Sequence, residues 1–158
     1  MSFTETKMYK KGNAGENIIR SMIVEKGWIT YSPDQHDKAH YFDMLATKDK
    51  KQIIALDVKT KARLNKWAAQ GIDERHYKEY RNFKSETNIN FYIFFVDDKN
   101  GDIHYAELDE LKSSFNPCKG IIAWPLSEMH HFAKLNDEQI KSLSQYDTRS
   151  YSYIPASE

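Results

Sequence analysis

The sequence lacks the features that would set it apart from ordinary globular proteins. It has a single cysteine, Cys118, so no internal disulfide can form and the chain fits a reducing compartment. No apolar run approaches the ~20 residues of a membrane span. The first residues, MSFTETKMYKKG, carry lysines without the apolar stretch of a secretory signal. We therefore expect a cytoplasmic protein with no membrane partner, folded as a single domain over residues 1–158.

Motifs for several common chemistries are missing as well. There is no P-loop, no GxGxxG fingerprint, no nucleophile elbow and no internal repeat. The polar stretch 34–40 contains His36, Asp37 and His40, but such clusters in polar loops are more often solvated than metal-bound, and no zinc-binding spacing supports them. An EF-hand beginning at Val96 fails because valine has no ligating side chain, and Asn100-Gly101 is instead a strong hairpin signal.

Charge is balanced overall but unevenly distributed along the chain. The formal net charge is +0, yet residues 59–84 contain eight basic and three acidic residues, giving +5. Residues 85–158 contain six basic and twelve acidic residues, giving −6. A basic segment of this kind orients a polyanion such as a nucleic acid, although solvated helix faces produce similar runs.

Hydrophobic periodicity predicts alternating helices and strands. Expected strands are 28–31, 41–47, 52–60, 90–96, 103–106 and 120–124. Expected helices are 12–27, 73–84, 108–115, a turn or short helix at 127–135, and 136–146. Residues 62–71 give a weak signal, either helical or an irregular arm carrying Trp67. This order predicts an α/β fold with a central mixed sheet flanked by helices, a core at about 12–107 and a C-terminal elaboration, a hairpin with helices, at about 108–158.

The stretch Tyr41–Lys61 reads as two strands joined by a charged turn, with Asp43 on the first strand and Asp57 and Lys59 on the second. Residues two apart on a strand share a face, so Asp57 and Lys59 project together, with Cα atoms roughly 7 Å apart. Ile54, Leu56 and Val58 take the opposite face. Two acids and a lysine on adjacent strands are typical of hydrolytic metal sites acting on phosphodiesters, whereas the alternative is an ordinary ion-pair cluster on a solvated sheet face.

Glu16 adds a third acid from the preceding helix. It lies three and seven residues before Ile19 and Ile23, and therefore on the same helical stripe as part of the apolar face. It either belongs to a polar site, pairs with Arg20 one turn later, or is an exposed glutamate favoured near a helix start.

These residues resemble the PD-(D/E)XK nuclease superfamily, and their layout is similar to archaeal Holliday junction resolvases and small phage or restriction-type nucleases. That family has a Gly-Glu pair on an opening helix, here Gly15-Glu16, then an aspartate, here Asp43, and an (Asp/Glu)-x-Lys element, here Asp57-Val58-Lys59. The resemblance covers about 12–84. The chain departs from the pattern in having Phe42 in place of proline, and in carrying aspartate where glutamate is more frequent.

The resemblance implies a restriction-endonuclease-like αβββαβ core and metal-dependent hydrolysis of DNA phosphodiester bonds, most simply as an endonuclease. Asp43, Asp57 and the backbone carbonyl of Val58 would bind Mg²⁺ or Mn²⁺, with Glu16 in direct or water-mediated support. Lys59 would position or help deprotonate the attacking water. Two alternatives stay open: a dimeric resolvase of four-way junctions, and a non-catalytic DNA-binding or interaction module on the same fold.

DNA contacts are expected from the basic segment and from the helix that follows it. Lys61 shares the face of Lys59 and is expected at a scissile or flanking phosphate. Tyr77 or Tyr80, and less favourably His76, would border the site. The expected nucleic-acid-binding residues are Lys61, Arg63, Lys66, Tyr77, Lys78 and Arg81. Trp67 would lie on a phosphate backbone, stack on a base, or be partly buried.

Overall fold

The computed structural model describes residues 6–33 and 40–147. The predicted loop residues His36 and Asp37, and the tail from 148 onward, lie outside the described residues. In the part of the chain that is described, no helix is both long enough and apolar enough to cross a membrane.

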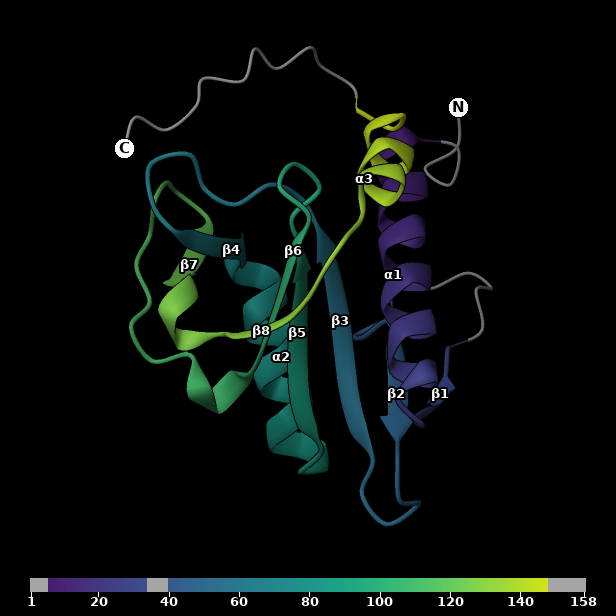
Figure 1. Ribbon diagram of the computed structural model, residues 1–158. Helices are drawn as coiled ribbons and strands as arrows, with labels where there is room; N and C mark the ends of the chain where they lie inside the picture. The colour runs from purple at the N-terminus through teal and green to yellow at the C-terminus, as the bar shows by residue number, and fades with distance from the viewer. Residues whose placement is uncertain (1–5, 34–39, 148–158) are drawn as a thin grey trace.

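The described residues form three α-helices and eight strands (Figure 1). The helices are α1 (Lys7–Glu25), α2 (Glu74–Thr87) and α3 (Asp137–Ser144). The strands are β1 (Ile29–Tyr31), β2 (Met44–Thr47), β3 (Ile54–Thr60), β4 (Ala69–Asp73), β5 (Asn90–Val96), β6 (Asp102–Glu107), β7 (Ile121–Pro125) and β8 (His130–Lys134). Short 3-10 helices cover Leu108–Glu110 and Leu126–Glu128.

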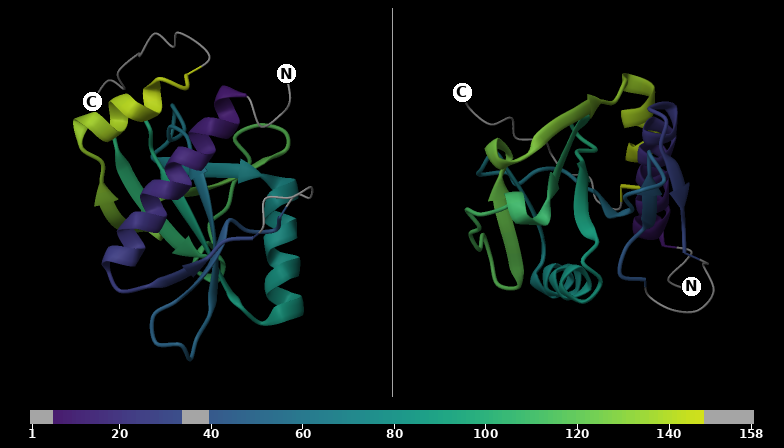
Figure 2. Two further views of the ribbon diagram at one scale, coloured as in Figure 1. Left: turned by 90° about the vertical axis from the view of Figure 1, so that its right-hand side faces the viewer. Right: turned by 90° about the horizontal axis from the view of Figure 1, so that it is seen from below.

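Six strands form one mixed sheet in the order β1-β2-β3-β5-β6-β8, and β4 pairs with β7 in a separate two-stranded sheet. Only β3 and β5 run parallel within the large sheet. Helices α1 and α3 lie on one face of the large sheet, and α2 with the small sheet lies on the other (Figures 1 and 2). The predicted mixed α/β fold, with a central sheet flanked by helices, is confirmed.

Alternation along β3 divides the interior into two cores. Leu56 and Val58 are buried with Ile19 and other residues on the α1 side. Ala55 is buried on the opposite side with Tyr80 of α2 and with Phe91 and Phe95 of β5. Burial of both faces is expected where a strand has helices on each side, and it makes β3 a rigid platform for the polar residues at its end.

Strand β2 pairs with only the first three residues of β3. It begins at Met44, three residues later than the expected start at 41, and Met44 pairs with Leu56. The amide of Asp43 still donates to the carbonyl oxygen of Leu56 at 3.0 Å. Beyond that bond, β3 continues to Thr60 alongside β5, so the last residues of β3 have a strand on one side only among those described.

Some expectations for secondary structure are wrong. In the weak stretch 62–71 the irregular arm is the alternative that holds up to Ala68, but Ala69 begins strand β4, which was not expected. The expected helix at 108–115 is a single 3-10 turn, and the expected helical segment at 127–135 contains strand β8. Both missed strands are defined by partners distant in sequence, β7 for β4 and β6 for β8, and pairing of that kind overrides weak local preference.

Other boundaries follow local signals closely. Helix α1 starts at Lys7, earlier than expected, because the Thr6 hydroxyl accepts a hydrogen bond from the Tyr9 amide at 3.2 Å. Asn136, at the start of the expected helix 136–146, caps α3 and accepts a hydrogen bond from the Gln139 amide at 2.8 Å. The predicted hairpin between β5 and β6 is confirmed, with Gly101 at φ +83°.

Candidate active site

Strand β3 presents Asp57 and Lys59 on the face that looks toward α2. The Lys59 ammonium lies 2.8 Å from Oδ2 of Asp57, and the hydroxyl of Tyr80 donates to the same oxygen at 2.7 Å. Asp57 is 6% exposed, so both contacts are made in a largely dry environment, where charge-assisted bonds hold their geometry firmly. Of the residues expected to border the site from α2, Tyr80 is the one that reaches it.

Asp43 lies at the unpaired edge of β3. Its Oδ2 accepts a hydrogen bond from the Val58 amide at 2.6 Å. In a strand the N–H and C=O of one residue point to the same edge, so the Val58 carbonyl is directed to the edge where Asp43 lies. The site therefore combines a carboxylate from before β2 with a carboxylate and a backbone carbonyl from β3.

Glu16 reaches the same site from α1 because that helix lies very close to β3. A Cβ atom on Gly15 would lie 1.8 Å from Oγ1 of Thr60, so only glycine permits this approach. The pKa of Glu16 responds to Asp43, Asp57 and Lys59, so its carboxyl group lies beside theirs. Arg20 bonds instead to Asn17 and Ser32, at 2.7 Å each, which disfavours the simple Glu16–Arg20 pair.

Burial, with the charges of neighbouring acids, raises the pKa of Asp43 and of Glu16. Burial, followed by the charges of Asp57 and Glu16, raises the pKa of Asp43 to about 9, against the opposing effects of the Val58 amide and Lys59. Burial is also the largest cause of the raised pKa of Glu16, to which Asp57 adds. Burial alone would lower the pKa of Lys59, but Asp57 and Asp43 outweigh it and keep the ammonium charged.

This donor set fits a hard divalent cation in chemistry. Carboxylate and carbonyl oxygens are the ligands that Mg²⁺ and Mn²⁺ prefer, and a cation would offset the repulsion that raises the pKa of Asp43. Within residues 6–33 and 40–147, no three His, Cys, Asp or Glu side chains already stand in an arrangement that would hold a metal ion. The candidate ligands are Glu16, Asp43, Asp57 and the Val58 carbonyl.

Lys61 continues the positive face of β3 beyond Lys59. Burial and the charge of Lys59 lower its pKa, with Asp73 opposing, and no hydrogen bond or ion pair engages its side chain among the described residues. Asp73 stands at the N-cap position of α2, where aspartate is a favoured cap, yet its side chain makes no capping bond. Its charge instead acts to raise the pKa of Lys59 and of Lys61. The local sequence does not predict this effect, because it does not predict strand β4.

The remaining predicted DNA-binding residues divide into exposed and engaged side chains. Arg63, Lys66 and Lys78 are exposed. Tyr77 packs against Trp124, with ring centroids 5.1 Å apart, and Arg81 pairs with Asp109 at 2.7 Å. These contacts already occupy Tyr77 and Arg81, whereas no hydrogen bond or ion pair engages the side chains of Arg63, Lys66 and Lys78 among the described residues.

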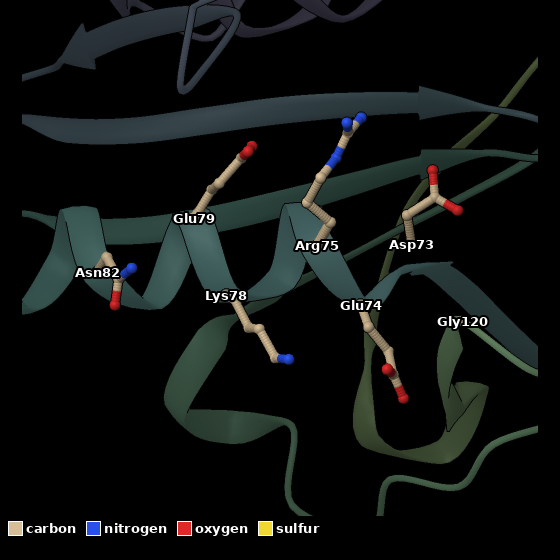
Figure 3. Close-up of a pocket in the computed structure, with 7 residues that line it drawn as sticks. All are labelled: Asp73, Glu74, Arg75, Lys78, Glu79, Asn82 and Gly120. Atoms are coloured by element: carbon tan, nitrogen blue, oxygen red, sulfur yellow. The ribbon is translucent and has the colours of Figure 1, made fainter.

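A shallow recess of about 530 Å³ runs along the exposed side of α2 (Figure 3). Its lining residues are Asp73, Glu74, Arg75, Lys78, Glu79, Asn82 and Gly120. Arg75 and Glu79 extend from one side of the helix, and Glu74 and Lys78 from the other (Figure 3). Because three acids accompany two basic residues, the recess is not by itself an anion site.

Comparison with solved structures identifies a protein with a similar fold. No protein-family model matches the sequence, and no curated protein matches it. Among solved structures, the chain is similar to Hjc, a Holliday junction resolvase from the archaeal hyperthermophile Archaeoglobus fulgidus, with a TM-score of 0.54 and 12% sequence identity. The match covers 74% of this chain and 90% of that one. The chain thus has the restriction-endonuclease-like α/β fold of Hjc.

Proposed function

We propose that the protein is a metal-dependent DNA nuclease that hydrolyses phosphodiester bonds as an endonuclease. The observation that carries the proposal is the meeting of Asp43, Asp57 and Glu16 at the edge of β3, with Lys59 on the same strand. An ion-pair cluster on a solvated face would not bury Asp57 to 6% exposure or raise the pKa of Asp43 to about 9.

Each side chain has a part that follows from its position. Asp43 and Asp57, with the Val58 carbonyl, would hold the cation, and Glu16 would support it through Asp43. The cation would supply Lewis-acid stabilisation of charge developing on the phosphate. Lys59 orients the attacking water and offsets negative charge in the transition state, while Asp57 fixes the direction of its ammonium. Tyr80 holds Asp57 in place from α2.

A cleavage assay with plasmid and linear DNA, with Mg²⁺ or Mn²⁺ and with EDTA, tests the proposal. We expect metal-dependent cleavage, reduced about 100-fold or more in Lys59→Ala. The matched control is Lys112→Ala, which removes an exposed lysine after the Leu108–Glu110 turn. Equal activity of Lys59→Ala and the wild type would exclude the mechanism. DNA binding without cleavage under every metal condition would instead support a non-catalytic module.

A second candidate function, a dimeric junction resolvase, is favoured by the similarity to the fold of a Holliday junction resolvase. Symmetric resolution of a four-way junction requires two sites in one assembly. A panel of duplex, single-stranded, flap and junction DNA, read together with the sedimentation mass, distinguishes the two. A monomer that cuts duplex as well as junctions would exclude the resolvase.

A further inference from the structure

The segment that leaves the active-site strand carries an exposed tryptophan among positive charges. Residues 61–68, the basic arm, contain Lys61, Arg63 and Lys66 and no acidic residue. Trp67 on this arm is 46% exposed, although large aromatic side chains are usually covered. Among the described residues, no ion pair or side-chain hydrogen bond engages any of the three cations of the arm.

Hydrogen bonds hold the backbone of the basic arm in place at both ends. At its start, the Lys61 amide donates to Val96 at 3.0 Å, and the Arg63 amide donates to a carboxylate oxygen of Asp97 at 3.3 Å. At its end, the Ala68 carbonyl accepts a hydrogen bond from the amide of Leu126, which follows β7, at 2.8 Å. Asp97 is 3% exposed, so its contact with the arm comes from a fixed point in the fold. The arm is therefore an anchored structure and not a loose loop.

The indole ring of Trp67 is supported from one side. Phe115 meets it edge to face, with ring centroids 5.4 Å apart and planes at 61°. Phe115 is itself fixed, because its amide and carbonyl exchange two 2.9 Å hydrogen bonds with Ala123 of β7. An exposed ring held in this way loses little side-chain entropy when it binds a flat ligand.

We propose that Trp67 is a stacking platform for an unpaired DNA base, and that the protein therefore favours DNA with unpaired bases close to the phosphate it cuts. The inference rests on the proposed nuclease function. Aromatic side chains flanked by free cations are the recurring arrangement for single-stranded nucleic acid, in which the base stacks and the cations follow the phosphates. A base within a duplex has no free face to offer, so the platform distinguishes unpaired from paired DNA.

The distance to the active site is compatible with one continuous strand of DNA. Trp67 follows Lys59 by eight residues, so their Cα atoms lie at most about 29 Å apart. That upper limit corresponds to about eight nucleotides at 3.4 Å per nucleotide. Lys61, Arg63 and Lys66 lie between the two points along the chain and would contact the intervening phosphates. The loop from β3 to β4 crosses from the large sheet to the small one (Figure 1).

The test compares binding of two labelled DNAs by fluorescence anisotropy in EDTA, where no cleavage occurs. One is a fully paired duplex, and the other is the same duplex with a short single-stranded flap. We expect Trp67→Ala to weaken binding of the flap DNA about tenfold, as for the loss of one stacked base, with duplex binding close to that of the wild type. Trp67→Phe should retain most of the flap affinity, and Trp67→Leu should behave like Trp67→Ala.

The control variant is Tyr31→Ala, which removes another exposed aromatic ring, 60% exposed on β1. It should bind both DNAs like the wild type. Equal weakening of both DNAs by Trp67→Ala, or no weakening, would overturn the inference. Wild-type flap affinity in Trp67→Leu would also overturn it, because binding would then need an apolar side chain and not an aromatic ring.

The inference and the proposed nuclease function can fail separately. A protein that cleaves DNA with metal, but whose flap binding does not depend on Trp67, would refute the stacking platform alone. A protein with Trp67-dependent flap binding that never cleaves would refute the nuclease proposal alone. Circular dichroism and thermal unfolding of each variant verify that the fold is retained.

Discussion

At the scale of single residues, the most unusual group is the carboxyl of Asp43. Its pKa of about 9, against an ordinary value of 3.8, means that the metal-free native state binds a proton there that the unfolded chain releases. Stability falls with pH wherever the native state binds more protons than the unfolded state. We therefore predict that the free energy of unfolding of the metal-free protein falls as pH rises from about 4 toward 9.

Asp43→Asn removes the titrating group and keeps an oxygen that can accept from the Val58 amide. The variant should show a flatter pH dependence and greater stability than the metal-free wild type at neutral pH. Urea denaturation in EDTA at several pH values measures both. Added Mg²⁺ should stabilise the wild type and not the variant, because the cation favours the ionised carboxylate. Parallel pH curves for the two proteins would refute the assignment.

The hydroxyl of Tyr80 fixes the orientation of Asp57, a candidate metal ligand. Burial, with the charge of Asp57, raises the pKa of Tyr80, so the hydroxyl remains a donor at working pH. Tyr80→Phe keeps the stacking on Phe91, at 4.5 Å between ring centroids, but removes the bond to Asp57. We expect kcat to fall about tenfold and the Mg²⁺ concentration for half-maximal cleavage to rise.

The control for this prediction is Tyr92→Phe, which removes a tyrosine hydroxyl from the opposite face of the large sheet. Its cleavage rate and Mg²⁺ dependence should match those of the wild type. A uniform loss of activity in Tyr80→Phe with an unchanged Mg²⁺ requirement would assign the hydroxyl to folding and not to ligand orientation.

At the scale of elements, contact between α1 and β3 decides where Glu16 lies. Gly15→Ala would place a methyl group 1.8 Å from Oγ1 of Thr60, and the helix must move to relieve the overlap. We predict a loss of about 1–3 kcal/mol in stability, together with a marked loss of cleavage, because Glu16 moves with the helix. Thermal unfolding and the cleavage assay measure the two effects.

Gly12 provides a matched control on the same helix. A Cβ atom there meets nothing within 4 Å. Gly12→Ala should therefore stabilise the protein by up to about 1 kcal/mol through helix propensity and leave cleavage unchanged. If both glycine variants behave alike, close packing at Gly15 is not what positions Glu16.

The sequence alone predicts the strands that their own hydrophobic pattern identifies. Alternation over Ile54–Thr60 identified β3 and the shared face of Asp57 and Lys59, and the apolar run Asn90–Val96 identified β5. Strand β4 was missed because Gln70 and Gly71 are poor strand formers, and the strand exists only through its pairing with β7.

The sequence predicts the acids and the lysine of the candidate site, but not the residues that hydrogen-bond to them or affect their charge. The shared face of Asp57 and Lys59 follows from strand periodicity. Asp43 was expected on the first strand of the same hairpin, but it lies just before β2, which begins at Met44. The hydrogen bond from Tyr80 depends on how α2 rotates as it docks on the sheet, which its periodicity did not distinguish from a role for Tyr77. The influence of Asp73 required β4, a strand defined by a distant partner.

At the scale of the whole molecule, folding redistributes the charge asymmetry of the sequence. Residues 59–84 are strongly basic, but Arg81 and Lys84 at their end pair with Asp109, and Lys84 also with Glu107. These pairs cancel positive charge on α2. The uncompensated charge is left on the basic arm beside the active-site strand, where Arg63 and Lys66 have no such partner among the described residues.

Salt dependence of DNA binding tests this distribution directly. The logarithm of the binding constant falls linearly with the logarithm of salt concentration, with a slope set by the number of phosphates neutralised. We predict that Arg63→Ala and Lys66→Ala each reduce the magnitude of that slope by about 1. Arg81→Ala should reduce it less, because Asp109 already offsets that charge at 2.7 Å.

Lys112→Ala, in the acidic half of the chain, should leave the slope unchanged and controls for a general loss of positive charge. Titrations of a duplex in EDTA over a range of KCl concentrations give the slopes of the wild type and of the four variants. A reduction by Arg81→Ala as large as that by Arg63→Ala would mean that the Asp109 pair opens on binding. DNA would then contact α2 as well as the basic arm, and the bound DNA strand would leave the active site over that helix.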